Sequence, residues 1–391
     1  MHIWITSHAM TSHVRPLLPV ADAARRAGHD VTVAVPAAAE PLARRQGFAT
    51  AAVGDDWLAQ LTGEDGRSPV VPLAELEDGA RTVAQQMAGG PAGRTAADLL
   101  ALAERKTPDL IVRASTEFGG ALAAEVLGVP HVSVSTGGAT ALTYGPDRLA
   151  ASLAPHREAL GLAPDPEGLA SYRYRHASFL PPGYDRAEES LPHTRCYRHA
   201  DPLTAGESLP EWLEQRRSGR PLVFASLGTL VPHVTGYGPA LVRMLVTALD
   251  GLEVDAIVST AGVLPAGVAP GRPHVVLVDT ISQPLLLAHC DVFVTHAGQN
   301  SVREALGAGV PMVTMPIMGD QLYNAARCVD AGVAATAPAA EATIARLRRE
   351  IRQVLSEPAY RERADTVRRQ MAALPSVDDL VAEFPALTGV R

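Results

Sequence analysis

The same local pattern recurs in both halves of the chain: an alanine-rich helical stretch, a glycine, and then a short apolar run. Glycine suits the left-handed backbone position just past a helix C-terminus. An uninterrupted apolar run is typical of a strand that is buried on both faces of a parallel sheet. The pattern therefore predicts helices alternating with parallel strands, a doubly wound α/β architecture. Clear examples are residues 25–35, 125–134, 304–315 and 329–336.

Length and one polar segment divide the predicted elements into two domains. The chain has 391 residues, more than the roughly 150 of an average domain. We expect an N-terminal domain over residues 1–200 and a C-terminal domain over residues 221–375. The polar, Pro-containing segment 201–220 is the expected linker. We expect the tail, residues 376–391, to pack back on the N-terminal domain.

Charge and composition exclude several classes of function. The formal net charge is -8, and there is no basic run of the kind that follows a nucleic-acid backbone. No segment fits a signal peptide or a membrane-spanning helix, so we expect a cytoplasmic protein without a membrane partner. Lys106 is the only lysine. Since no glycines precede it, a Walker-type phosphate loop is excluded, and a pyridoxal phosphate site is a poor interpretation.

Metal-ligating residue types lack the spacing of a metal site. Cys196, Cys290 and Cys328 lie far apart, which predicts neither a disulfide framework nor a Cys-x-x-Cys site; we interpret them as buried apolar side chains. His193 and His199 share no ligand spacing with nearby cysteines or carboxylates. We therefore expect no metal and no cofactor.

Residues 291–324 carry the strongest functional signal. An apolar strand over 292–295 leads through a tight turn into a helix that opens with Asn300 and Ser301. A helix N-terminus has unpaired N–H groups and about half a positive charge, so it is a ready site for a phosphate. Gly298 lets the backbone approach such a ligand closely.

Polar side chains around that turn can complete a ligand site. His296 at the strand end can add a hydrogen bond to the same phosphate. Glu304, one turn into the helix, can hold paired ribose hydroxyls because its carboxylate only accepts hydrogen bonds. Asp320 and Gln321 open the next helix at the carboxyl end of a strand, where ligands bind in open α/β sheets, and they suit the hydroxyls of a sugar.

A second small loop follows the apolar strand over 222–225. Ser226, Gly228 and Thr229 form a turn whose backbone N–H groups could flank a diphosphate. The two loops could therefore lie on either side of one diphosphate.

The run from His296 to Pro311, followed by Asp320, Gln321 and Asn324, resembles the donor signature of family 1 glycosyltransferases. These enzymes have the GT-B fold, in which two Rossmann-like doubly wound domains face each other across a cleft. The alanine- and arginine-rich composition is most similar to actinobacterial members that glycosylate secondary metabolites, including antibiotics.

The resemblance implies a role for each matching residue. His296, Asn300 and Ser301 would bind the diphosphate and Glu304 the ribose; Asp320 with Gln321 would bind the transferred sugar, and Gln283 would lie near the nucleoside. Thr280 stands where many members carry a tryptophan that stacks on the base. The donor is therefore a UDP- or a TDP-sugar, with the base left open.

The resemblance also places a catalytic histidine in the loop after the first strand, which matches residues 12–16 here. Independently, Ser12 is a good N-cap and Pro16 is tolerated in a first turn, which puts His13 at a helix start. The helix dipole would disfavour imidazolium and keep His13 neutral, able to act as a base near pH 7.

Many relatives pair this histidine with an acid that follows a strand ending near Val112. Ala114 occupies the aligned position here. Two alternatives follow: Glu117 reaches His13, or His13 acts without a carboxylate.

The sequence thus predicts an inverting transfer of a sugar to a small, hydrophobic secondary-metabolite acceptor, with His13 as general base. Two alternatives stay open: a nucleotide-sugar epimerase or hydrolase on the same scaffold, and a non-catalytic partner protein that binds nucleotide sugar. A homodimer is a further open point. The identity of the sugar and acceptor, and linkage through O, N, S or C, are not encoded in a readable way.

Overall fold

The computed structural model describes residues 1–56, 87–137, 146–199, 208–214, 219–263 and 274–389, in two compact units. The first unit contains the described residues up to 199 together with residues 373–389. The second contains the described residues from 208 to 372. Much of the predicted linker, residues 201–207 and 215–218, lies outside the described residues.

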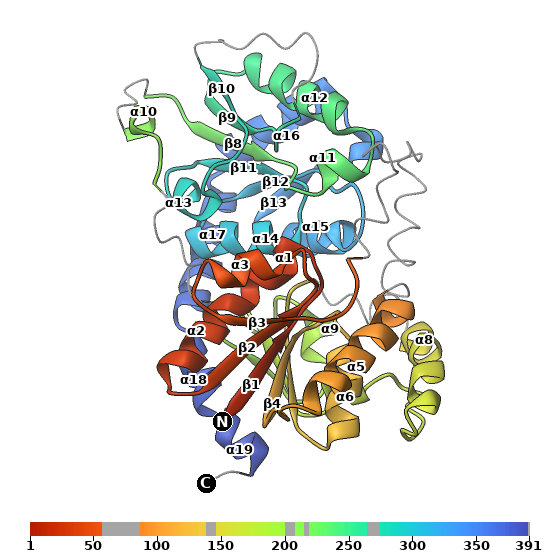
Figure 1. Cartoon of the computed structure of the whole chain (residues 1–391). Coiled ribbons are helices and arrows are strands. Elements are labelled where there is room, and N and C mark those ends of the chain that lie inside the picture. The colour runs from red at the N-terminus through yellow and green to blue at the C-terminus, as the bar shows by residue number, and fades with distance from the viewer. Residues whose placement is uncertain (57–86, 138–145, 200–207, 215–218, 264–273, 390–391) are drawn as a thin grey trace. The chain divides into compact units, whose positions relative to one another are not determined.

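Seven parallel strands form one sheet in the described part of the first unit, in the order β3-β2-β1-β4-β5-β6-β7 (Figure 1). They are β1 (His2–Thr6), β2 (Asp30–Val35), β3 (Ala49–Ala52), β4 (Leu110–Ala114), β5 (His131–Val134), β6 (Arg175–Ser178) and β7 (Thr194–Cys196). The helices are α1 (Thr11–Val14), α2 (Leu18–Arg26), α3 (Glu40–Arg44), α5 (Gly90–Ala103), α6 (Gly119–Leu127), α8 (Pro146–Ala159), α9 (Arg186–Glu189), α18 (Val377–Ala382) and α19 (Phe384–Thr388).

Both faces of this sheet are buried, as the interior strand β1 shows. Because successive side chains of a strand point to opposite faces, β1 supplies two different apolar clusters. Ile3 and Ile5 pack in the cluster that contains residues of α2 and α18, whereas Trp4 packs with residues of α5 and α6. Figure 1 shows these two helix pairs on opposite sides of the sheet.

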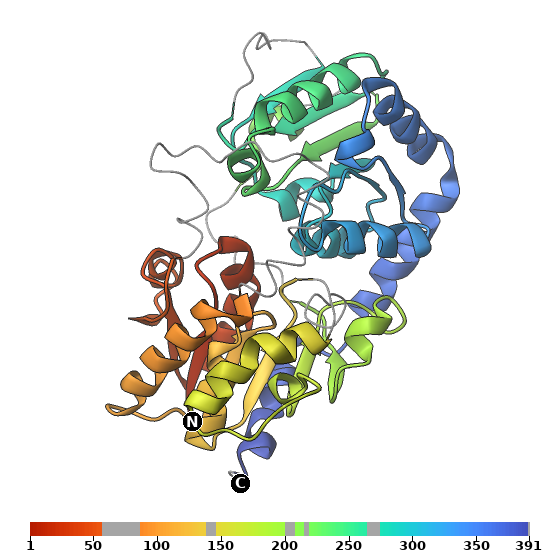
Figure 2. The ribbon, with the colours of Figure 1, turned by 90° about the vertical axis from the view of Figure 1, so that its right-hand side faces the viewer.

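The C-terminal tail is part of the first unit. Phe384 is fully buried in its core, and the Glu383 carboxylate accepts hydrogen bonds from Arg175 (2.6 Å), Arg195 (3.1 Å) and the Tyr197 hydroxyl (2.8 Å). The start of β1 and helix α19 accordingly lie toward the same end of this unit in both views (Figure 2).

Six parallel strands form the sheet in the described part of the second unit, in the order β10-β9-β8-β11-β12-β13. They are β8 (Leu222–Ser226), β9 (Asp255–Ser259), β10 (Val275–Val278), β11 (Val292–Thr295), β12 (Met312–Thr314) and β13 (Ala334–Thr336). The helices are α10 (Glu211–Glu214), α11 (Val231–Val234), α12 (Gly238–Asp250), α13 (Gln283–Leu287), α14 (Gln299–Ala308), α15 (Gln321–Asp330), α16 (Ile344–Ser356) and α17 (Pro358–Ala372).

The predicted doubly wound α/β architecture is confirmed, and so is the predicted glycine at the end of helices. Gly128 ends α6 at φ +67° and Gly309 ends α14 at φ +70°, the left-handed conformation that a side chain disfavours. Strands β5 and β12 follow these two glycines, as the repeated pattern predicts. Among the described residues, no helix has both the length and the apolar character needed to span a membrane.

Candidate functional site

His296 is wedged between two glycines at the carboxyl end of β11. A Cβ atom added to Gly228 would lie 2.7 Å from Cε1 of His296, and one added to Gly298 would lie 2.5 Å from Nε2. β8 and β11 are neighbouring parallel strands, so their carboxyl ends bring the two predicted loops together. Nδ1 of His296 is buried, and the backbone of Ser226 acts as a hydrogen-bond acceptor toward the ring. The His296 ring thus lies where the two predicted loops meet, between Gly228 of the first loop and Gly298 of its own.

The backbone around His296 is held in an uncommon conformation. Ala297 has φ +65°, which is rare for a residue with a side chain. Its N–H donates to the Thr295 hydroxyl (3.2 Å) and its carbonyl accepts from the Asn324 amide (3.0 Å). These contacts stabilise the turn that starts α14 at Gly298. No side chain of the described residues caps that helix, so its first N–H groups keep their capacity to bind an anion.

Three of the predicted donor-site side chains lie together on α13 and α14. Gln283 Nε2 donates to the Glu304 carboxylate at 2.7 Å and lies 3.4 Å from the Ser301 hydroxyl. Ser301 is buried, and the side chain of Glu304 is only 11% exposed. Glu304 is therefore not a solvated surface glutamate. Arg303 lies 3.5 Å from its other carboxylate oxygen.

Asp320 and Gln321 stand at the start of α15, as predicted. Gln321 Oε1 accepts hydrogen bonds from the backbone N–H groups of Ile317 (2.9 Å) and Met318 (3.0 Å). Asp320 Oδ2 accepts from the Asn324 amide at 3.0 Å. The Gln321 side chain therefore orders the turn after β12, and its amide nitrogen remains the group that can donate to a ligand.

The last predicted donor residues lie on the same two loops. Ser226 is the final residue of β8 rather than the first of the turn, because it pairs with Thr295 and with Ser259 in the sheet. Its hydroxyl accepts from the N–H of Gly228 (3.1 Å). Thr229 is exposed, and Asn300 is the second residue of α14.

His13 lies on α1, but the predicted cap is wrong. The helix begins at Thr11, so Ser12 is its second residue and Met10 precedes it. A four-residue helix offers little dipole; burial is the main cause that lowers the pKa of His13 to about 3, with a smaller contribution from His8. The prediction of a neutral imidazole therefore holds for a different reason.

Glu117 does not reach His13. Its carboxylate accepts from the Thr6 hydroxyl (2.6 Å) and from the N–H of Gly120 (3.0 Å). The groups beside Nδ1 of His13 are instead two hydroxyls, Thr116 at 3.2 Å and Thr136 at 3.3 Å. Sequence reasoning missed both threonines, because they follow different strands and become neighbours only when those strands pair in the sheet.

A second histidine also escaped sequence analysis. His8 lies in the loop after β1, its ring centroid 5.7 Å from that of His13. Its Nε2 donates to the carbonyl of Thr116 at 2.8 Å, and burial lowers its pKa. Its place in the same loop as His13 was the available signal.

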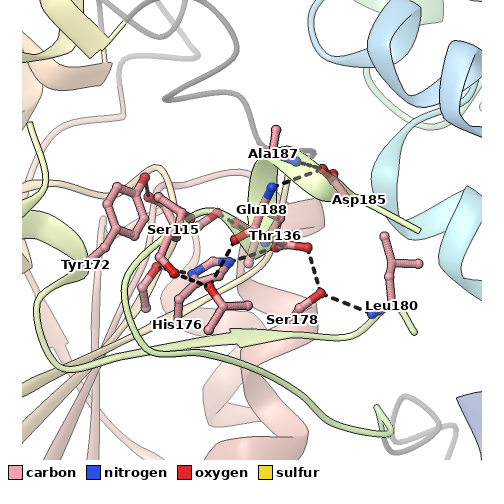
Figure 3. Close-up of polar contacts among 12 residues, drawn as sticks. Ser115, Thr136, Tyr172, His176, Ser178, Leu180, Asp185, Ala187 and Glu188 are labelled. Carbon is pink, nitrogen blue, oxygen red and sulfur yellow. Dashed lines mark hydrogen bonds and ion pairs between the residues drawn. The ribbon is translucent and has the colours of Figure 1, made fainter. Parts of the chain in front are cut away.

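Behind this edge of the first sheet lies a buried polar network (Figure 3). His176 and Ser178 of β6 both contact the Glu188 carboxylate, at 2.8 and 2.6 Å, and Nδ1 of His176 lies 3.0 Å from the Ser133 hydroxyl. All four side chains are at most 3% exposed. Such enclosure fits a structural network rather than a substrate site.

Burial also governs the electrostatics of the second unit's site. It lowers the pKa of His296 to about 4, so the imidazole is neutral near pH 7. Among the described residues, no cluster of three or more His, Cys, Asp or Glu side chains is arranged to hold a metal. Cys290 and Cys328 are buried as predicted, whereas Cys196 is only half-buried.

Comparison with known proteins agrees with this geometry. Residues 198–371 match the family described as UDP-glucoronosyl and UDP-glucosyl transferase. Tylactone mycaminosyltransferase of Streptomyces fradiae is 25% identical over 430 aligned positions, covering 100% of this chain and 93% of the relative. TDP-daunosamine transferase DnrS of Streptomyces peucetius is 26% identical, with 100% of both chains covered.

The fold is also that of solved glycosyltransferases. The crystal structure of glycosyltransferase VinC in complex with dTDP superimposes with a TM-score of 0.76 at 25% identity, and all of both chains is covered. The family match falls on the unit that holds His296, Gln283 and Glu304. The chain is therefore a nucleotide-sugar-dependent glycosyltransferase of the GT-B fold, and residues 198–371 match the family of UDP-glucoronosyl and UDP-glucosyl transferases.

Proposed function

We propose that this glycosyltransferase moves a sugar from a nucleoside diphosphate donor to a small, hydrophobic secondary-metabolite acceptor, with inversion at the anomeric carbon. Support comes from the relatives, whose names include a tylactone mycaminosyltransferase and a TDP-daunosamine transferase. The observation that carries the proposal is the seat of His296 between Gly228 and Gly298, at the uncapped start of α14.

In this proposal the diphosphate binds at the start of α14. The N–H groups of residues 298–301 and the imidazole of His296 would stabilise its charge as the bond to the sugar breaks. Ser226, Thr229, Asn300 and Ser301 would add donors around the same phosphates. These groups would do the work that a metal does elsewhere, and metal independence stays a prediction.

Glu304 and Gln283 would bind the nucleoside. The Glu304 carboxylate can accept from both ribose hydroxyls, and its contact with Gln283 (2.7 Å) holds it in place before the nucleotide arrives. Asp320 and the Gln321 amide would bind hydroxyls of the sugar. The dTDP in the VinC structure favours a TDP-sugar, and side-by-side titration with TDP and UDP decides between them.

His13 would act as general base. Its Nε2 takes the proton from the acceptor's nucleophilic atom, which forms its bond to the anomeric carbon while the bond from that carbon to the diphosphate breaks. The electron pair of the broken bond leaves with the diphosphate. A neutral imidazole is required at the start of this step, and the buried setting of His13 supplies it.

The test combines turnover with nucleotide binding. With TDP- and UDP-sugars and a panel of aromatic and macrolide acceptors, read by mass spectrometry, wild type should yield a glycosylated acceptor. His13→Ala should reduce turnover by about 100-fold or more while the Kd for the nucleotide stays within about twofold. Unchanged turnover in His13→Ala would remove this residue from the mechanism.

The same assay addresses the two alternatives. An epimerase or hydrolase would consume the donor when no acceptor is present, and a non-catalytic partner protein would bind the nucleotide without turnover. Either outcome would overturn the proposed transfer. A cytoplasmic location and a homodimer stay predictions.

A further inference from the structure

Two threonine hydroxyls meet at one nitrogen of His13. Thr116 Oγ1 lies 3.2 Å and Thr136 Oγ1 3.3 Å from Nδ1, and both threonines are buried, with 5% and 3% exposure. They follow β4 and β5, neighbouring parallel strands whose carboxyl ends lie at the same edge of the sheet. Two neutral hydroxyls therefore lie beside Nδ1 of His13, where the resemblance led us to expect a carboxylate.

Both threonines are held by further contacts. The carbonyl of Thr116 accepts from His8 Nε2 (2.8 Å), and the N–H of Thr136 donates to the Ser115 hydroxyl (3.3 Å). The carbonyl of Ser115 in turn accepts from the Tyr172 hydroxyl (3.2 Å; Figure 3) and from the buried guanidinium of Arg113 (3.1 Å). The hydroxyls are therefore set in place by a packed, hydrogen-bonded framework rather than by mobile side chains.

We propose that Thr116 and Thr136 are positioning residues for His13: their oxygens accept the Nδ1–H hydrogen bond and leave the Nε2 lone pair as the base. The inference rests on the proposed role of His13. Only one neutral tautomer presents a lone pair at Nε2, and it is the tautomer in which Nδ1–H donates to the threonine oxygens. After proton transfer the imidazolium keeps its Nδ1–H bond to the same hydroxyls, so no hydrogen bond is broken in the step.

A neutral partner has a chemical consequence. A carboxylate both orients a histidine and stabilises its positive form. A hydroxyl can also orient the ring, but it stabilises the imidazolium much less. The ionisable group that acts on His13 is His8, and Glu117 and Arg113 act on His8 in turn. Glu117 is engaged with Thr6 and Gly120, and Arg113 with backbone carbonyls that include those of Ala114 and Ser115.

The test uses Thr116→Val and Thr136→Val, singly and together, because valine keeps the shape and removes the hydroxyl. Thr116→Ser and Thr136→Ser are the matched controls, since they keep the hydroxyl and lose only a methyl group. We expect kcat to fall about 10-fold in each valine variant and about 100-fold in the double variant. The acceptor KM and the nucleotide Kd should stay within about twofold, and both serine variants should keep most of the activity.

A spectroscopic measurement separates positioning from a general structural role. The nitrogen-15 NMR shifts of His13 should report the Nδ1–H tautomer in wild type and in the serine variants, and a mixture of tautomers in the double valine variant. Full kcat in the double valine variant, together with an inactive His13→Ala, would overturn this inference alone. Full activity of His13→Ala would overturn the proposed base and this inference with it.

Discussion

Replacing Gly228 by alanine tests whether His296 grips the donor diphosphate. The new Cβ would lie 2.7 Å from Cε1 and 2.8 Å from Nε2 of His296, so the ring must retreat by roughly 1 Å to reach an ordinary separation of about 3.5–4.0 Å. In the proposed complex that movement would break the hydrogen bond from His296 to the diphosphate, and a hydrogen bond to a charged group is worth about 1.5–3 kcal/mol. We expect the Kd for TDP or UDP, measured by calorimetry, to rise about 10- to 100-fold.

The backbone at Gly228 requires a control, because φ is +73° there and alanine costs about 1–2 kcal/mol in the left-handed region. Gly262 in the same unit has φ +79°, and a Cβ there would meet nothing within 4 Å. Gly262→Ala should therefore lose similar stability in urea unfolding and bind nucleotide like wild type. Equal nucleotide affinity of Gly228→Ala and Gly262→Ala would refute the assignment of His296.

Three further predictions concern stability, each measured by urea unfolding. Burial lowers the pKa of His131 to about 3; since the unfolded chain binds this proton first, stability should fall by about 1.4 kcal/mol per pH unit as pH drops from about 6.5 toward 3. His131→Gln should lessen that slope, and an unchanged slope between pH 6 and 5 would contradict it. Glu188→Ala should cost about 3–5 kcal/mol, because it leaves the buried His176 without its carboxylate; a loss below 1 kcal/mol would show that the pair is dispensable. Glu383→Ala should cost about 1–3 kcal/mol by releasing Tyr197 and two arginines, and an unaltered midpoint would deny that the tail is anchored there.

Much of the fold was predictable because the controlling signals are local in sequence. A glycine after a helix and an apolar run after the glycine are short-range patterns, and Gly128 and Gly309 adopt the left-handed conformation that the pattern predicts. The error at Ser12 has an equally local origin. Ser12 is a good capping residue, but the helix begins at Thr11, two residues before the start that a cap at Ser12 predicts.

The candidate donor site was largely predictable for the same reason. His296, Gly298 and Ser301 belong to one strand, turn and helix, so their proximity follows from the chain itself. The contact of Gln283 with Glu304 joins residues 21 positions apart. Its residues were named from the resemblance, whereas the contact itself came from the structure.

By itself, the sequence determined the alternation of helices and strands and the position of the helix start to which we assign the diphosphate. Only the tertiary structure decided the partners of His13. Thr116 and Thr136 lie 103 and 123 positions away from it in the chain. Glu117, the carboxylate that was a candidate partner of His13, accepts a hydrogen bond from Thr6 instead. The physical reason is strand order: β1, β4 and β5 become neighbours only when the sheet assembles, and no local pattern in the chain records which loops that places side by side.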